Sequence, residues 1–134
     1  MSRVPLTTGR AGRRLSSLGN RSAPATVDYG MIARWWRGWA ATQENAEAYE
    51  ELLRTTILPW VDSHEGHRGS YFVRRDVDEG VEFATLTLWD SLDAVKAFAG
   101  EDYEVAVVPE PARAVLARWD ERSAHYEVVT GPEL

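Results

Sequence analysis

The segment "RWWRGW", residues 34 to 39, places three tryptophans and two arginines within six positions. Tryptophan rings fill protein cores, and they also form the walls of ligand sites. An arginine can hold an anionic oxygen, but a buried guanidinium needs an anionic partner or a ligand. If the segment is a β-strand, Trp35, Arg37 and Trp39 face one side and Trp36 faces the other. The segment is therefore a candidate for ligand binding as well as for packing.

Histidines supply the second kind of candidate chemistry. His125 lies in "SAHYEVV" near the C-terminal end, and its imidazole can move a proton near neutral pH. His64 and His67 lie in the polar loop "HEGH", without a second cluster to complete a metal site, so we expect a solvated loop or a lid. Neither a glycine-rich phosphate loop nor a nucleophile elbow is found. The sequence predicts neither a metal nor a cofactor.

The composition is that of one globular domain. The chain has 134 residues, of which 44% are hydrophobic and 27% charged, and no run of about 18 apolar residues occurs. Cysteine is absent, which excludes disulfides and thiolate chemistry and favours a cytoplasmic location. Because the charge of −6 divides into +5 for residues 1 to 27 and −11 for the remainder, we expect no nucleic-acid binding by the folded part.

Residues 1 to 30 are rich in serine, glycine, arginine and proline and are expected to form a flexible basic leader. Residues 31 to 134 are expected to form the domain. Its predicted elements, in chain order, are a strand over 31 to 39, a helix capped by Thr42 and ended by Pro59, a hairpin of 70 to 75 and 81 to 89, a helix from Ser91 to Gly100, a helical stretch over 103 to 108 that resumes after Pro111, and a strand over 123 to 129.

This order predicts an α+β, ferredoxin-like βαββαβ fold with an antiparallel sheet and two helices on one face. The strand "VEFATLTLW" alternates two sets of residues that are both largely apolar. Helices can cover only one of these faces. We therefore expect a second copy of the sheet to cover the other face, which gives a homodimeric α+β barrel.

The element order, "TLTLWDSLDAVKAFAG" and the final "HYEVV" together resemble the antibiotic biosynthesis monooxygenase family over residues 31 to about 129. The resemblance implies a dimeric α+β barrel. It implies no single reaction, because this fold hosts many chemistries.

Haem-degrading members of the family place asparagine, tryptophan and a haem-ligating histidine where this sequence has Arg37, Phe98 and Val108. None of the three matches, so the resemblance does not favour haem degradation. Cofactor-free members that form quinones use tryptophan, asparagine and tyrosine where this sequence has Trp89, Thr85 and Val95. Here only the tryptophan matches.

The resemblance implies that Thr85 and Trp89 face the barrel interior, together with Phe83 of the same strand. It also implies that Arg37 faces the barrel interior, and because side chains alternate along a strand, Trp35 and Trp39 are expected to face the same way. In the last strand, His125 and Glu127 are expected to point into the same cavity. Two interpretations remain: Arg37 and Glu127 form a buried ion pair, or Arg37 holds an enolate oxygen while His125 moves its proton.

The predicted function is a cofactor-independent monooxygenase of secondary metabolism. It would act on a small aromatic or polyketide-like molecule, with His125 and Arg37 as catalytic residues and the other candidates, Trp35, Trp39, Phe83, Thr85, Trp89 and Glu127, binding substrate. The alternatives are a non-catalytic binding or structural barrel, and a cyclase or isomerase that uses the same proton-moving residues without oxygen.

Overall fold

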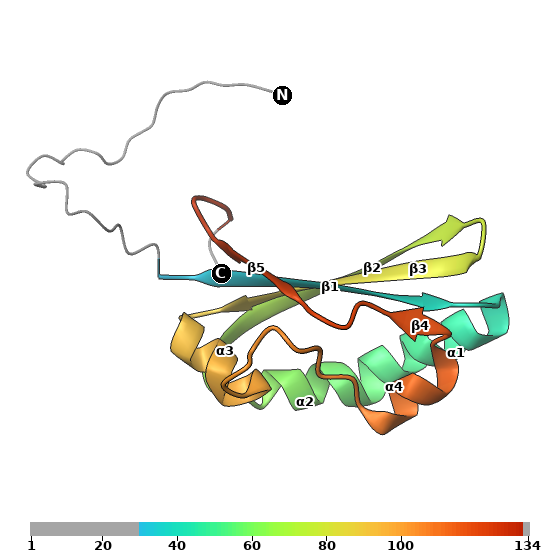
Figure 1. The fold of residues 1–134 in the computed structure, drawn as a ribbon, viewed down its shortest axis with the longest axis horizontal. Coiled ribbons are helices and arrows are strands. Elements are labelled where there is room, and N and C mark those ends of the chain that lie inside the picture. Colours follow the sequence, from blue (N-terminus) through green and yellow to red (C-terminus); the bar gives the residue numbers. More distant parts are fainter. Residues whose placement is uncertain (1–29, 133–134) are drawn as a thin grey trace, which may run out of the picture.

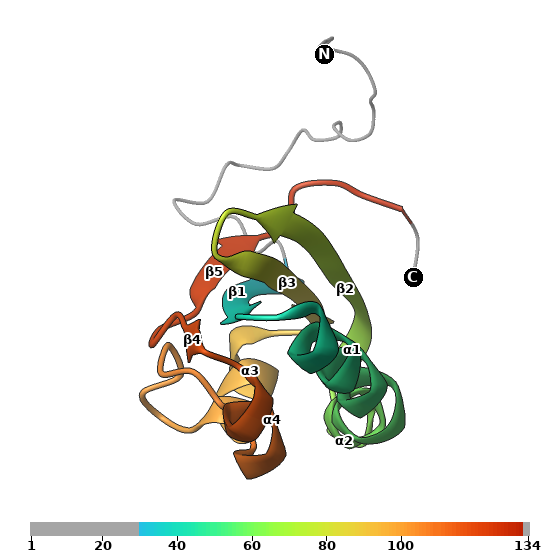
Figure 2. The same cartoon turned by 90° about the vertical axis from the view of Figure 1, so that its right-hand side faces the viewer.

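The computed structural model describes residues 30 to 132, so the predicted leader falls, apart from Gly30, outside the described residues. One antiparallel sheet forms a layer, and all helices lie on the same face of it (Figures 1 and 2). The predicted α+β, ferredoxin-like fold is thereby confirmed. No helix in this part of the chain is long and apolar enough to cross a membrane.

The elements follow the predicted order, with one additional short strand, β4, at the end of the stretch that was predicted to resume as a helix after Pro111. They are β1 (Ile32–Ala40), α1 (Gln43–Leu52), the π-helical η1 (Leu53–Ile57), α2 (Leu58–Asp62), β2 (His67–Val77), β3 (Gly80–Trp89), α3 (Leu92–Ala99), α4 (Glu110–Val115), β4 (Arg118–Trp119) and β5 (Ala124–Glu127). The sheet order is β2-β3-β1-β4, and β5 also pairs with β1.

Both predicted helix caps are present. The hydroxyl of Thr42 accepts a hydrogen bond from the backbone N–H of Asn45, and the hydroxyl of Ser91 accepts one from that of Ala94. The predicted hairpin also forms, with longer strands than expected. Gly80, which opens β3, has φ +133°, and a Cβ there would lie 2.2 Å from the carbonyl oxygen of Ala40. Only glycine lets the hairpin approach the end of β1 this closely.

Two predicted boundaries are wrong, both at prolines. Pro59 does not end the first helix, because the π-helical turn of η1 precedes it and the chain stays helical to Asp62. In this turn Leu58 donates to the carbonyl of Leu53, a wider spacing that accommodates the missing proline N–H. Residues 103 to 108 are not helical, and Pro111 lies in the first turn of α4, where proline is well tolerated.

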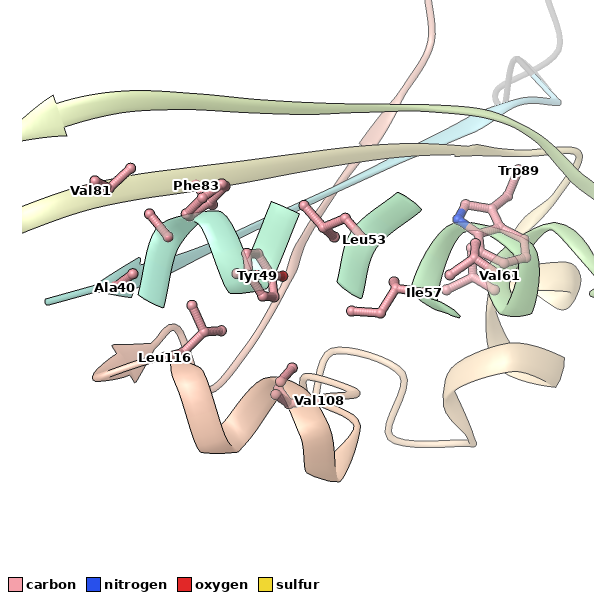
Figure 3. Packing of buried hydrophobic residues seen from close by; sticks show 13 residues of the cluster. Ala40, Tyr49, Leu53, Ile57, Val61, Val81, Phe83, Trp89, Val108 and Leu116 are labelled. Atoms are coloured by element: carbon pink, nitrogen blue, oxygen red, sulfur yellow. The ribbon is translucent and has the colours of Figure 1, made fainter. Parts of the chain in front are cut away.

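The main core lies between the sheet and the helices (Figure 3). Val81, Phe83 and Trp89 project from β3 into this layer, and the edge of the Phe83 ring contacts Tyr49 of α1. In the antiparallel register, Trp36 of β1 is paired with Thr85 of β3, so the even-numbered residues of β1 share this face with the odd-numbered residues of β3.

The opposite face of the sheet carries no helix, and we call it the open face. Its apolar residues are Ala33, Trp35, Trp39, Tyr71, Val73, Ala84, Leu86, Leu88 and Tyr126, and its charged residues include Arg37, Arg75, Glu82 and Arg118. The side chains of Tyr71 and Tyr126 are 55% and 58% exposed. Ala84, Leu86 and Leu88 thus form an apolar stripe along β3, as predicted, and no helix covers it in a single chain.

Candidate functional site

A narrow pocket of about 60 Å³ lies between the sheet and the helices. Its walls come from the strands β1, β2 and β3, from the helices α1, η1, α2, α3 and α4, from the loop before α4, and from Ser123 before β5. The lining residues are Arg34, Trp36, Tyr49, Ile57, Trp60, Val61, Phe72, Thr85, Thr87, Phe98, Val107, Val108, Pro109, Ala112 and Ser123. No carboxylate belongs to this set, and Arg34 supplies its only charged side chain. The remaining lining is apolar and aromatic except for the hydroxyl groups of Thr85, Thr87, Ser123 and Tyr49.

Arg34 is buried, with 5% of its surface exposed. Its Nη1 donates to the carbonyl oxygen of Tyr103 at 2.5 Å, and its Nη2 donates to that of Val105 at 3.2 Å. Among residues 30 to 132, no carboxylate lies within salt-bridge distance of its guanidinium. Arg34 is thus an anion-binding group whose present partners are neutral.

Burial lowers the pKa of Arg34 to about 10, so the guanidinium remains charged at neutral pH. The shift corresponds to a cost on the order of 3 kcal/mol for keeping the charge in the folded chain. An anion bound beside Arg34 would offset that cost.

His125 of β5 lies beside Arg34, with its Nε2 3.0 Å from Nη1 of the arginine. Since a guanidinium can only donate, Nε2 must be the accepting nitrogen, and the proton of the neutral ring must be on Nδ1. Nδ1 is buried and has no partner in the described part of the chain. Burial and the charge of Arg34 both lower the pKa of His125, while Glu104 opposes them, so His125 is neutral at pH 7.

Ser123 adds a second polar group to the pocket. It is 5% exposed, and its hydroxyl is buried without a hydrogen-bond partner among the described residues. An unpartnered buried hydroxyl costs free energy unless a ligand or water satisfies it. Ser123 therefore extends the polar end of the pocket that Arg34 begins.

Residues 101 to 109, which we call the cover segment, close one side of this pocket with Val107, Val108 and Pro109. The segment contains neither helix nor strand. Backbone bonds to Glu121 and Ser123 hold its middle, together with the two bonds from Arg34. Arg34 thus binds the cover segment with the same N–H groups that an anionic ligand would use.

A second cavity, about 350 Å³ in volume, lies between η1 and the β2-β3 hairpin and shares Phe72 with the first. Its cations are paired, because Arg54 and Arg74 both donate to Glu50. Although this cavity is larger, both of its arginines have a carboxylate partner, so we place the candidate site in the narrower pocket, whose arginine has none among the described residues.

The prediction that Arg37, Trp35 and Trp39 share a face with Phe83, Thr85 and Trp89 of β3 is wrong. In the register, Trp35 is paired with Leu86, Arg37 with Ala84 and Trp39 with Glu82, all on the open face. Nε of Arg37 donates to Asp120 at 3.0 Å rather than to Glu127. The guanidinium of Arg118 stacks 3.7 Å above the ring of Trp39, with that of Arg37 at 5.1 Å.

Phe83, Thr85 and Trp89 do share one face, as predicted, but it is the face that the helices cover. Thr85 lines the narrow pocket. Phe83 packs in the core and lines the second cavity, and Trp89 is completely buried, with its Nε1 donating to the hydroxyl of Thr87. Of these three residues, only Thr85 is in the wall of the candidate site.

His125 and Glu127 also lie on the helix-covered side, because they are paired with Arg34 and Ile32. The prediction that they point into one cavity with Arg37 is therefore wrong. His125 reaches the polar end of the pocket through Arg34, while Glu127 is exposed. The roles proposed for these residues in binding and catalysis stay predictions.

Arg34 was missed by the sequence reasoning, although it lies in the same six residues as Arg37. Trp36 was correctly assigned to the helix side, and alternation from Trp36 places Arg34 there too. This alternation was visible in the sequence, but the site was expected on the face without helices, so Arg37 was chosen instead of Arg34.

The "HEGH" histidines hold local structure. His64 Nδ1 lies 2.9 Å from the carbonyl oxygen of Trp60, and His67 lies between Asp62 at 2.9 Å and Ser70 at 2.7 Å. Ser70 lines neither cavity. No group of three or more metal-binding side chains occurs in the described part of the chain.

An antiparallel ferredoxin-like sheet with all its helices on one face defines a class of α+β domains. The chain belongs to the antibiotic biosynthesis monooxygenase family, whose model matches residues 39 to 110, more than half of the sequence. The resemblance inferred from sequence is confirmed. No curated protein matches the chain.

Solved structures share the fold. A candidate antibiotic biosynthesis monooxygenase from Caulobacter crescentus CB15 is 20% identical, with a TM-score of 0.56 over 75% of this chain and 92% of that one. A second, from Chloroflexus aurantiacus J-10-fl, is 19% identical, with a TM-score of 0.54 over 77% and 97%. The MhuD protein, crystallised as a mutant with two manganese protoporphyrin IX molecules per active site, is 18% identical, with a TM-score of 0.50 over 76% and 98%.

Proposed function

We propose that this protein is a cofactor-independent monooxygenase that oxidises a small aromatic or polyketide-like phenol or enol in the pocket between the sheet and the helices. Membership of the monooxygenase family supports the reaction class. The observation that carries the proposal is the contact between Arg34, which lines an apolar pocket, and the neighbouring His125, which lies outside the lining. Secondary metabolism is the proposed setting.

Arg34 would stabilise the oxyanion that forms when the substrate loses a proton. A buried guanidinium in an apolar site is effective at this, since little water screens its charge. Arg34 takes the role that the sequence assigned to Arg37, which lies on the opposite face.

His125 would accept the proton. Its lowered pKa keeps it neutral at pH 7, but Nε2 is occupied by Arg34 as long as the pocket holds no substrate. When the guanidinium turns to the substrate oxygen, Nε2 becomes free to accept. Substrate binding and base activation are thus coupled through one side chain.

The electron-rich anion then reacts with oxygen. A ring C–H and O₂ give a peroxide, which loses water to leave a C=O group, so one oxygen atom enters the product and the other leaves as water. Thr85 and the aromatic walls position the ring and exclude bulk solvent.

A homodimer is the second part of the proposal. The open face carries Trp35, Trp39 and two half-exposed tyrosines, and a second copy of the same sheet is the partner that matches it most simply. Trp35 is therefore proposed as a packing residue of a dimer interface, whereas Trp39, which is 7% exposed, is already covered by Arg118 in a single chain.

The lining of the pocket weighs against a haem enzyme. None of its fifteen residues is histidine, so an axial ligand would have to come from outside the lining.

Oxygen uptake tests the reaction. Purified protein is mixed with anthrone or with dihydroxynaphthalenes, and O₂ consumption is measured together with ¹⁸O incorporation from ¹⁸O₂. We expect one O₂ consumed for each quinone formed. Folded Arg34→Gln and His125→Gln variants should lose about a hundredfold or more in kcat/KM, whereas Arg37→Gln, on the open face, should stay near wild type.

The same experiment separates the rival functions. Binding without oxygen uptake or product would indicate a non-catalytic module. An isomeric product formed without oxygen would indicate a cyclase or isomerase. Full turnover in folded Arg34 and His125 variants would overturn the mechanism.

A further inference from the structure

The polar end of the narrow pocket contains more hydrogen-bonding capacity than the protein uses. Arg34 has five N–H groups, of which three have partners among residues 30 to 132. The hydroxyl of Ser123, in the same lining, has none. Both residues are 95% buried, so bulk water does not readily satisfy them.

The net charge of this end is positive. The lining contains Arg34 and no carboxylate, and the neighbouring His125 is neutral at pH 7. By contrast, the arginines of the second cavity have a carboxylate partner in Glu50. A ligand that compensates the charge of Arg34 must therefore be an anion.

The remaining lining defines the body of that ligand. Trp36, Trp60 and Phe98 contribute aromatic surface, most of the rest is apolar, and Thr85 and Thr87 add two hydroxyl groups. Such walls accept a flat ring and offer no partner to a second charged group.

We infer that the pocket binds an aromatic carboxylate, with the carboxylate on Arg34 and the hydroxyl of Ser123 and the ring between the sheet and the helices. This inference rests on the proposed function, because it names the substrate class for the same site. The substrate would thus carry a carboxylate next to the phenol or enol that reacts, so that the N–H groups of Arg34 contact both the carboxylate and the oxyanion.

Binding requires the cover segment to move. A pocket of about 60 Å³ is much smaller than typical ligand sites of several hundred Å³. The carbonyls of Tyr103 and Val105 accept hydrogen bonds from Arg34, and a carboxylate competes for the same donors. A carboxylate adds the attraction of opposite charges, which neutral carbonyls cannot supply to Arg34, so it displaces these carbonyls and frees the cover segment.

The test is a binding measurement with a matched pair of compounds. Isothermal titration calorimetry compares 2-naphthoate with 2-naphthamide, which has nearly the same shape and no charge. We expect 2-naphthoate to bind at least about tenfold more tightly to the wild-type protein. Amide resonances of residues 103 to 107 should shift on addition of 2-naphthoate and not of 2-naphthamide.

Variants assign the effect to residues. Arg34→Gln should abolish the preference for the carboxylate, Ser123→Ala should reduce it several-fold, and Arg37→Gln should leave it unchanged. Arg34→Lys, which retains the charge, should keep part of it, so loss of folding in Arg34→Gln would not decide the outcome. Circular dichroism confirms the fold of each variant.

Equal affinity of the wild-type protein for the two compounds, no binding of either, or a preference that survives in folded Arg34→Gln would each overturn the inference. These outcomes are distinct from failure of the proposed function. Binding of 2-naphthoate without oxygenation of any phenol would refute the oxygenase and leave the carboxylate site intact. Oxygenation of neutral substrates without any preference for the carboxylate would refute the carboxylate site and leave the oxygenase intact.

Discussion

Nη1 of Arg34 lies 3.0 Å from Nε2 of His125, and this contact fixes the protonation of the imidazole. The guanidinium must donate, so Nε2 cannot carry a proton while the contact exists. The ring proton is then on Nδ1, which is buried and has no partner among the described residues. Arg34 thus keeps His125 neutral, and the same guanidinium would hold the substrate anion that forms when His125 accepts a proton.

The first prediction concerns this tautomer. We expect ¹⁵N NMR to find the neutral Nδ1–H form of His125 at pH 7, and its pKa to lie below 6.5 because burial and the charge of Arg34 both disfavour the imidazolium. Arg34→Gln should raise the pKa of His125, since it removes the second cause. The Arg37→Gln variant is the control, and an Nε2–H tautomer in wild-type protein would contradict the argument.

The second prediction follows from the same pKa. His125 binds a proton less readily in the folded chain than in the unfolded chain, where its pKa is near 6.5. The associated stability is therefore present above about pH 6.5 and is lost as the pH falls through the lower, folded pKa. His125→Gln, which retains an acceptor for Arg34, should reduce the decline in the free energy of unfolding between pH 7 and pH 5. Urea unfolding across this range measures it, and an unchanged slope would count against the lowered pKa.

Local signals in the sequence were sufficient for most of the fold. The hydroxyls of Thr42 and Ser91 accept hydrogen bonds from backbone N–H groups three residues later, which marks two helix starts. Alternation in "VEFATLTLW" marks a strand with two apolar faces. The boundaries at Pro59 and Pro111 failed because proline acts differently by position. It was accommodated by a π turn in one case and by the first helical turn in the other.

The site was harder to predict, because alternation alone does not say which face of a strand meets the helices. That depends on the register between β1 and β3, where Trp36 is paired with Thr85 and Arg37 with Ala84. A shift of one residue in the pairing exchanges the two faces. Trp35, Arg37 and Trp39 were assigned correctly to the face without helices. The error was to place Phe83, Thr85 and Trp89 on that face with them, since these residues lie on the side that the helices cover.

The third prediction concerns the open face. If a second copy covers it, the protein should elute as a dimer in size-exclusion chromatography with light scattering. Tyr71→Glu should shift it to a monomer, because the tyrosine is 55% exposed in a single chain and a charge there would be desolvated in the interface. Leu58→Glu, an exposed position on α2, is the control. A wild-type monomer at high concentration would contradict the proposed interface.

The fourth prediction separates two tryptophans that the sequence makes look alike. Trp89 has no exposed surface, packs against Phe98 and His67, and donates to Thr87. Replacing it with alanine should lower the free energy of unfolding by about 3–5 kcal/mol, the range for a large buried aromatic side chain. Trp89→Phe should cost less and should leave the affinity for 2-naphthoate near wild type.

Trp36 should behave in the opposite way. It is half-buried, lines the pocket beside Thr85, and donates from Nε1 to the carbonyl oxygen of Asp120 at 2.7 Å. Trp36→Phe should weaken 2-naphthoate binding by about tenfold, because it removes ring surface and the bond that orients it. Urea unfolding and calorimetry on both Phe variants provide the comparison. Weaker binding in Trp89→Phe but not in Trp36→Phe would place the ligand outside this pocket, and would return the tryptophans of "RWWRGW" to packing alone.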